Sequence, residues 1–503
     1  MQFPGSRSRD TEVTSDGHGL PDWLTQARFP AQLQGLILGL YASTAFLNAA
    51  LLFIIEPMVA KMMLPFAGGS PAVWNTTVLF FQLCLLLGYL YAHFAGTWLG
   101  TSRHALLHLI LLLAGVLCLP VAIDADWFAA RTMGPGVAVF SALVDAIGFP
   151  FLALSAGAPL LQKWLAEGSH RPARDPYFIY AASNLGSIVG LMAYPLFFER
   201  HLTLAQQADF WLLAYLALLL GSAACILLFV QPLSGVSIHA GAFVGNAARS
   251  VLKTGPIHAT RRLRWVCWSF VPSSLLLGVT SYITGDIATA PLLWTIPLAL
   301  YLVTYVLAFA RPNWAMHAFV VRRQGFLLLA SALTVFVQAT HPVILILPIH
   351  LSAFFFTAWV CHGQLAKDRP EPSRLTEFYV CISVGGVLGG LFNTIVAPHL
   401  FSSIFEYPLA MIAAAFLRPT IGHGSEGNEN RWSDCLPPVA LFAAMLVLIS
   451  VAAAARIPPR NAHLLTFAIP GVVCLFFAYR PVRFGLGLVA VLLGSLVAPQ
   501  PLG

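Results

Sequence analysis

The sequence predicts an all-α membrane protein that crosses the bilayer about 15 times, at about 20 apolar residues per crossing. Of its 503 residues, 58% are hydrophobic and only 9% are charged, whereas soluble domains carry about 25% charged residues. Mean hydropathy is +0.79, and apolar runs recur along the whole chain. Most of the surface must therefore face lipid rather than water.

A hydropathy window of about 19 residues places the individual helices. Seven spans are predicted in the first part of the chain, near 33–55, 72–95, 104–123, 136–161, 177–198, 207–230 and 266–284. Eight more are predicted near 289–310, 325–340, 342–361, 377–397, 406–417, 437–455, 462–479 and 483–498. The polar residues before the first apolar run do not resemble a cleavable signal, so we expect the first span to remain as an anchor.

The distribution of basic residues predicts the orientation. With alternate loops on opposite sides, the loops on the N-terminal side hold 22 of the 27 Lys and Arg residues. Cytoplasmic loops carry such an excess, so we expect a multi-pass protein of the cytoplasmic (inner) membrane with its N-terminus inside and its C-terminus outside. The net charge of +7 then suits anionic lipid head groups and requires no nucleic acid partner.

Two patterns recur along the chain and suggest an internal duplication. PAVW opens the second span at 71–74, and PLLW opens the eighth at 291–294, 220 residues later. A Gly-x-x-x-Gly pattern at 186–190 recurs at 385–389, 199 residues later. Both pairs lie six helices apart, and six is even, so the halves have the same orientation. This predicts a 12-helix core of two parallel six-helix repeats, as in major facilitator transporters, followed by three additional helices.

These features divide the chain into five parts. We expect a polar cytoplasmic tail at 1–32, a first half at 33–231, a basic cytoplasmic linker at 232–264, a second half at 265–417, and a loop with three further helices at 418–503.

Several long strings carry a family resemblance. They include EPMVAKMMLPFAGGSPAVWNTTVLFFQLCLLLGYLYAH from Glu56, DPYFIYAASNLGS from Asp175 and LTEFYVCISVGGVLGGLFNTIVAP from Leu375. Over about residues 33–418 the sequence resembles the membrane region of bacterial fused major-facilitator/spermidine-synthase-like proteins. Members of that family commonly add an aminopropyltransferase-like domain, which this sequence lacks. The resemblance implies a transporter-like fold and suggests a polyamine or related small cation as substrate.

Glu56 is the first candidate for a functional side chain, because a charge in hydrocarbon costs several kcal/mol unless it faces a cavity or a partner. It follows a long apolar run and precedes Pro57. Lys61 lies five residues further on, and the two could line the outer end of a pathway as a pair. The alternative is a carboxylate that ends a helix at the aqueous interface.

Other acidic residues lie near predicted helix ends. Asp286 is placed like Glu56 but in the second half, where a turn explains it equally well. Asp145 and Asp209 are expected at the interface. Asp175 before Pro176 is typical of an N-cap, and Glu377 in the first turn of its helix can interact with the helix dipole.

A third group of candidates consists of uncharged polar and aromatic side chains within the spans. If the protein is a transporter, these would line a central cavity, and the aromatic rings could contact a cation. As plain interhelical hydrogen bonds, the polar ones need no substrate. The residues are Trp74, Asn75, Gln82, Tyr180, Ser183, Asn184, Trp294 and Asn393.

The histidines and cysteines predict no metal site and no cofactor. His104 and His108 have the i, i+4 spacing of metal ligands, but no acidic helper accompanies them. His350 could relay protons near neutral pH, and a hydrogen-bonded structural histidine is the alternative for it and for His362. The eight cysteines have no metal-ligand spacing and are expected to pack as small apolar residues.

Two functional hypotheses follow, and neither needs a soluble catalytic domain or a nucleotide-binding motif. The first is a transporter that moves a polyamine or another small metabolite by alternating access, with protonation of Glu56 or His350 as coupling. The second is a non-transporting anchor for a separate aminopropyltransferase-like protein, with the basic 249–264 segment as docking surface. A membrane-embedded enzyme acting on a lipid or polyamine is a third reading.

Overall fold

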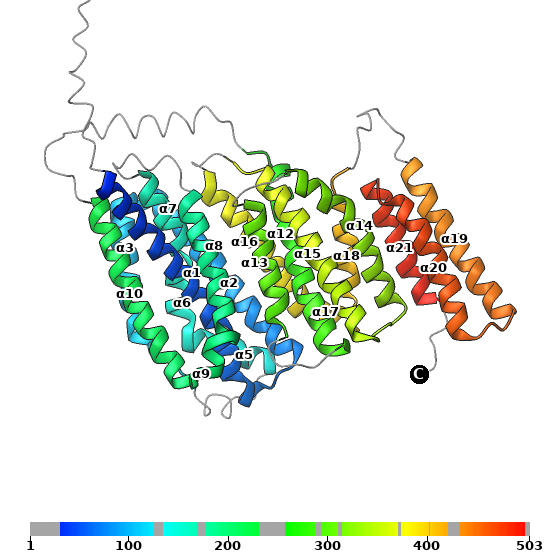
Figure 1. Cartoon of the computed structure of the whole chain (residues 1–503), viewed down its shortest axis with the longest axis horizontal. Coiled ribbons are helices and arrows are strands. Elements are labelled where there is room, and N and C mark those ends of the chain that lie inside the picture. Colours follow the sequence, from blue (N-terminus) through cyan, green and yellow to red (C-terminus); the bar gives the residue numbers. More distant parts are fainter. Residues whose placement is uncertain are drawn as a thin grey trace, which may run out of the picture.

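The computed structural model describes residues 31–123, 134–167, 177–230, 257–287, 293–309, 314–370, 374–401, 403–420 and 432–497. Helices stand side by side across this described part, and it contains no strand (Figure 1). The predicted N-cap at Asp175, the tail at 1–30 and most of the 232–264 linker lie outside it.

The first half contains the helices before the linker. In order they are α1 (Ala31–Ala67), α2 (Pro71–Leu99), α3 (Thr101–Gly115), η1 (Val116–Cys118), α5 (Pro135–Leu143), η2 (Val144–Gly148), α6 (Phe149–Ser155), α7 (Gly157–Glu167), α8 (Tyr177–Ala193), η4 (Tyr194–Phe198), α9 (Glu199–His201) and α10 (Leu204–Val230).

The second half and the three additional helices follow. They are α12 (Ala259–Tyr282), η5 (Ile283–Ile287), α13 (Thr295–Phe309), α14 (Trp314–Phe336), α15 (Val343–Lys367), α16 (Leu375–Leu391), η7 (Phe392–Val396), α17 (Ala397–Leu400), α18 (Glu406–Phe416), α19 (Trp432–Ala454), α20 (Pro459–Phe477) and α21 (Pro481–Val497).

These helices confirm a polytopic membrane protein. In the described residues, 11 helical segments are long and apolar enough to cross a bilayer, and four apolar helices are shorter. The four short ones correspond to the predicted eighth, twelfth, fourteenth and fifteenth spans. Helix α18, the predicted twelfth span, has 11 residues and is about 16 Å long at 1.5 Å per residue. That is about half of the hydrocarbon thickness of about 30 Å.

The repeated glycines bring equivalent helices into backbone contact in both halves. In the first half, a Cβ on Gly190 of α8 would lie 2.5 Å from the carbonyl oxygen of Ala50 on α1. In the second half, a Cβ on Gly389 of α16 would lie 2.9 Å from the carbonyl oxygen of Phe270 on α12. Ala50 and Phe270 are 220 residues apart, the same separation as the PAVW and PLLW patterns. Small residues permit this close approach. The sequence repeat is therefore also a structural repeat.

The contacts between the halves follow the same symmetry. Helix α2 packs against α16, and its equivalent α13 packs against α8, the equivalent of α16. Trp74 and Trp294, which are equivalent residues of the two patterns, stack with ring centroids 3.7 Å apart. A residue that contacts its own equivalent lies beside the symmetry axis. The two halves therefore meet around an approximate two-fold axis that passes near this pair.

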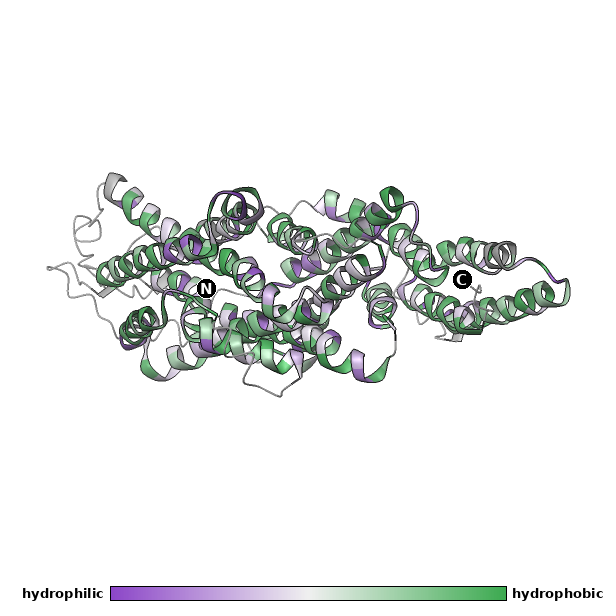
Figure 2. Ribbon diagram, turned by 90° about the horizontal axis from the view of Figure 1, so that it is seen from below, coloured by the Kyte–Doolittle hydropathy of each residue, from purple (hydrophilic) through white to green (hydrophobic). Residues whose placement is uncertain are grey.

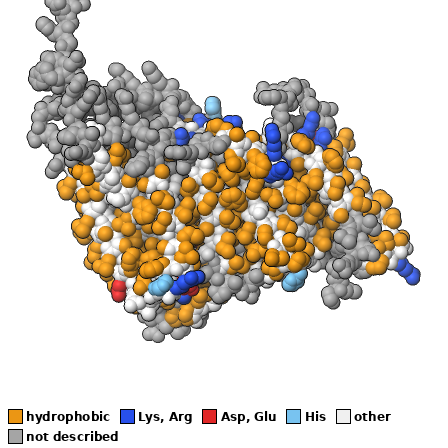
Figure 3. Space-filling model, viewed as in Figure 1, with side chains coloured by type: hydrophobic (Ala, Val, Ile, Leu, Met, Phe, Trp, Pro, Cys, Tyr) orange, Lys and Arg blue, Asp and Glu red, His pale blue; other side chains and the backbone are white. Residues whose placement is uncertain are grey.

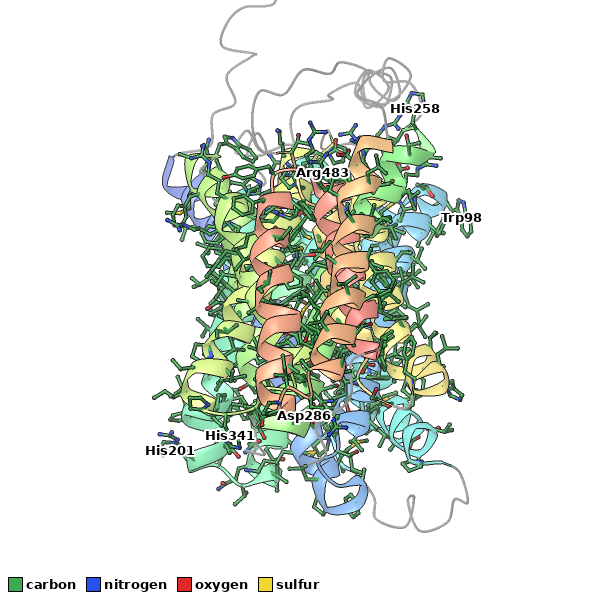
Figure 4. All side chains as sticks on the ribbon, turned by 90° about the vertical axis from the view of Figure 1, so that its right-hand side faces the viewer. Trp98, His201, His258, Asp286, His341 and Arg483 are labelled. Carbon is green, nitrogen blue, oxygen red and sulfur yellow. The ribbon has the colours of Figure 1, made fainter. Side chains whose placement is uncertain are left out.

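Charged side chains gather at the two ends of the bundle, and an apolar band covers the face between them (Figure 3). Helices α1, α3 and α12 begin at one end, and Arg261, Arg262 and Arg483 lie there; we call this end the basic rim. Lys61, His201 and Asp286 lie at the opposite rim, as the labelled residues in Figure 4 illustrate. The first described helix begins at the basic rim and the last ends at the opposite rim.

Ion pairs at the basic rim include residues that we expected in the basic cytoplasmic linker. Arg261 Nε donates to Asp368 Oδ1 at 2.9 Å, and Arg262 pairs with Glu377 at 2.6 Å. Both arginines belong to the first turn of α12, which begins at Ala259. This part of the expected docking segment is thus helical and ion-paired.

Helices α19 to α21 pack together beside the second half (Figure 2). Helix α21 contacts α18 and α14, and α20 contacts α14. At their junction lies Arg418, which is 4% exposed. It donates to the carbonyl oxygens of Ala478 at 2.6 Å and Val321 at 2.9 Å, and its guanidinium lies over the Phe484 ring. A buried arginine therefore links the additional helices to the core.

Candidate functional site

Glu56 lies inside helix α1, which continues through Pro57 to Ala67. Its side chain is 6% exposed, and no described residue forms a hydrogen bond or ion pair with it. Phe53 and Ala60, three and four residues away on the same helix face, pack against the apolar cluster that both halves share. The alternative of a helix-ending carboxylate at the aqueous interface is therefore wrong.

Lys61 does not pair with Glu56. Its ammonium lies 2.8 Å from the carboxylate of Glu199 on α9 at the opposite rim. Residues five apart on a helix differ by about 140° in direction, so their side chains do not face one another. The predicted Glu56–Lys61 pair is thus wrong, and Glu56 remains a buried carboxyl group without a partner in the described chain.

Polar side chains connect α2 to the second half. Gln82 Nε2 donates to Ser273 Oγ at 3.0 Å, and the Ser273 hydroxyl donates to the Gly386 carbonyl at 2.9 Å. Because the serine proton is already used, the amide nitrogen of Gln82 must face the serine. Its carbonyl oxygen Oε1 then faces Gly390 and has no hydrogen-bond partner.

Asn393 in η7 has the same unsatisfied group. Its Nδ2 donates to the Gly389 carbonyl and to Ser274 Oγ, both at 2.8 Å, which again fixes the orientation of the amide. The oxygen Oδ1 is buried without a partner. We call Gln82, Asn393 and the neighbouring Asn75 the polar seam.

Asn75 joins the seam close to the opposite rim. Its Nδ2 donates to Ser281 Oγ at 3.2 Å, and Thr394 Oγ1 donates to its backbone carbonyl at 3.2 Å. The Asn75 side-chain oxygen is also without a partner. The neighbouring Trp74 stacks on Trp294, and the Trp74 indole N–H is unsatisfied. The polar seam thus presents several buried amide oxygens that can accept hydrogen bonds.

Sequence reasoning missed the hydroxyl groups that orient these amides. Ser273, Ser274 and Ser281 lie on α12, the second-half equivalent of α1. The signal was present as two adjacent serines after Pro272 in an otherwise apolar span.

His350 has partners on both ring nitrogens. Nδ1 lies 2.8 Å from Ser331 Oγ and 2.9 Å from the Tyr407 hydroxyl, and Nε2 lies 3.0 Å from Thr334 Oγ1. The network belongs to the second half, in α14, α15 and α18. This arrangement is typical of a hydrogen-bonded structural histidine. His362 pairs through Nδ1 with Thr304 at 2.9 Å, and its Nε2 is without a partner.

The remaining sequence candidates lie away from the seam or are only partly described. Asp286, Asp145 and Asp209 are exposed, as expected for interfacial residues. Asn184 is half-buried on α8 with an unpaired Nδ2, and Tyr180 lies in α8 with its side chain outside the described part.

Metal ligands are not clustered in the described residues: no group of three or more His, Cys, Asp or Glu could hold an ion there.

Comparisons with known proteins give similarity of fold only. No family model matches the chain, and no curated protein matches it. Among solved structures, the inward-open xylose transporter XylE from E. coli has a TM-score of 0.48 and 13% identity, over 78% of this chain and 98% of that one. The human organic anion transporter MFSD10 has a TM-score of 0.46 and 15% identity, over 77% of this chain and 100% of that one. A POT family transporter in complex with 5-aminolevulinic acid has a TM-score of 0.44 and 12% identity, over 75% of this chain and 94% of that one.

The class of protein follows from the repeat, the helix order and the interface between the halves. The chain is a multi-pass membrane protein with a core of two parallel six-helix halves that repeat the same helix order and pack around an approximate two-fold axis. Three further helices are attached to the second half.

Proposed function

We propose that this protein is a secondary transporter that binds a small organic cation between its two halves, with polyamines as the first substrate class to test. The observation that carries the proposal is the set of unpaired acceptors facing the contact between the halves. These are the carboxyl group of Glu56 and the amide oxygens of Gln82 and Asn393. Ammonium groups are hydrogen-bond donors only and complement such acceptors.

The burial of Glu56 supports an exchange mechanism. An unpaired carboxylate in a low-dielectric interior is costly, so we expect either a proton or a substrate cation to neutralise it. The residue 220 positions later is Leu276, so only one half carries the acid. Binding of a cation would then release the proton, and rocking of the halves would carry one or the other across the membrane. His350, whose nitrogens are both bonded, is the weaker choice for coupling.

The Trp74–Trp294 stack supports a closure at the opposite rim. Trp74 lies in the first turn of α2, which begins at Pro71, and Trp294 lies directly before α13. Alternating access requires that such contacts form in one state and break in the other. The orientation predicted from basic residues would make this closure the outer one.

Uptake of labelled spermidine into liposomes containing the purified protein tests the proposal. Glu56→Gln keeps the shape of the side chain and removes its charge, and we expect at least a tenfold loss of flux. Asp209→Asn is the matched control, since this acid is exposed on α10, and it should transport like the wild type. Gln82→Leu, which introduces the residue found at its equivalent Leu302, should raise the Michaelis constant.

Two results would count against the proposal. Wild-type flux in Glu56→Gln would remove the carboxyl group from the mechanism. Absence of flux for polyamines and for a panel of amino acids and organic cations would instead favour the anchor hypothesis, and binding of an aminopropyltransferase-like protein would then be measured.

A further inference from the structure

A second cluster of unpaired buried polar groups lies at the basic rim of the first half, away from the polar seam. It forms where the C-terminal part of α2, the first two turns of α3 and helix α7 meet. His104 and Trp164 are 0% and 1% exposed, and neither ring has a hydrogen-bond partner. His108 Nδ1 and the Tyr91 hydroxyl are also buried without partners.

The four side chains form one contiguous group. The ring centroids of Tyr91 and His104 are 4.9 Å apart, those of Tyr91 and His108 are 6.1 Å apart, and those of His108 and Trp164 are 5.9 Å apart. Unpaired buried polar groups are rare in native proteins and each requires an explanation. Four such side chains in one place point to a group that they would bind.

The surroundings favour negative charge. A Cβ placed on Gly96 would lie 2.8 Å from Lys163 Nζ and 3.2 Å from His104 Nδ1, so the ammonium and the imidazole approach the same point. Helix α3 starts next to this point, with no capping side chain and no acidic residue in its first turn. The positive end of a helix attracts anions.

We propose that Tyr91, His104, His108 and Trp164, together with Lys163, bind a small inorganic anion of the size of chloride. Each of the four rings can present an N–H or O–H donor to an anion. The unpaired atoms are closed off from solvent, and this is why the ligand proposed is a single small ion rather than a larger molecule. Because the ion would hold α2, α3 and α7 together, it would act on the first half as a structural ligand and would not be the transported substrate.

Binding of radioactive chloride to the detergent-purified full chain tests this site directly. We expect saturable binding by the wild type and a higher midpoint of thermal unfolding in sodium chloride than in sodium gluconate of equal ionic strength. His104→Leu removes both ring nitrogens at similar volume and should lower the chloride affinity at least tenfold. Gly96→Ala should also weaken binding, because its methyl group would crowd Lys163 and His104.

The controls separate this site from the substrate site. Gly39→Ala adds a methyl group where no atom lies within 4 Å, and it should bind chloride like the wild type. Glu56→Gln should also bind chloride normally, whatever its effect on transport. Absence of saturable binding by the wild type, or equal binding by His104→Leu, would overturn the proposal. The proposal would also be overturned if His104→Leu were more stable than the wild type by the same amount in both salts and the wild type bound no chloride. The four side chains would then be packed polar groups without a ligand.

Discussion

Two adjacent glycines on α16 allow the helix contact to be tested with a matched pair of substitutions. A Cβ on Gly385 would collide with the Val266 carbonyl oxygen and would lie 2.7 Å from Ser269 Cβ, whereas a Cβ on Gly386 meets nothing within 4 Å. Gly386→Ala should stabilise by about 0.5–1 kcal/mol through helix propensity. Gly385→Ala gains the same amount but forces α12 and α16 apart, and overpacking costs about 1–3 kcal/mol.

The two variants should therefore differ by about 1–3 kcal/mol, the overpacking cost alone. Scaling the unfolding entropy of soluble proteins to a chain of this length gives about 1 °C per kcal/mol. We expect Gly385→Ala to unfold about 1–3 °C below Gly386→Ala in detergent, at one fixed heating rate since such unfolding is often irreversible. Equal midpoints for the two variants would refute the inference that backbone contact at Gly385 holds the helices together.

Three further predictions concern the ends of the molecule. Arg418→Met removes the donor to the Ala478 carbonyl, which lies beyond the end of α20, and an additional donor to the Val321 carbonyl. A lost partner of this kind costs about 1–3 kcal/mol, so the midpoint of thermal unfolding should fall, and an unchanged midpoint would show that the additional helices dock without Arg418. Trp74→Leu removes about 0.5–1.5 kcal/mol of stacking on Trp294, which weakens the closure at the opposite rim. A cysteine introduced at Ser281 should therefore react faster with an impermeant maleimide in the Trp74→Leu variant than in the protein that keeps Trp74. Lys61→Ala should cost at most about 1 kcal/mol, as exposed ion pairs do, and a larger loss that persists in high salt would contradict a surface role.

Much of the fold could be predicted because hydropathy and small residues act locally. The predicted apolar runs coincide with helices of the described residues, and the recurring Gly-x-x-x-Gly pattern indicated the repeat, whose glycines the structure places against α1 and α12. The helix ends were less accurate. The first span was predicted to end near residue 55, but α1 continues to Ala67 through Pro57 and Pro65, since neighbouring helices in a membrane can accommodate a proline.

The site could be predicted as a set of residues but not as a set of contacts. Glu56, Gln82 and Asn393 stood out because polar groups in apolar spans are costly. Their partners depend on which helix faces which, and hydropathy carries no such information. Lys61 was therefore assigned to the nearest acid in sequence, whereas its partner Glu199 is 138 residues away. The chemistry of the α2–α3–α7 junction was missed because His104 and His108 were judged only as metal ligands.

The stacking of Trp74 on Trp294 has a consequence for the origin of the chain. If the two halves were separate, identical six-helix proteins in the same membrane orientation, this tryptophan would contact the identical tryptophan of its partner. A single change at that position would then have altered both sides of the contact at once. After a fusion the two positions would be free to diverge, and Glu56 and Leu276 are equivalent positions that differ in this chain. The Trp74–Trp294 stack therefore has the form that the contact would have in such a homodimer.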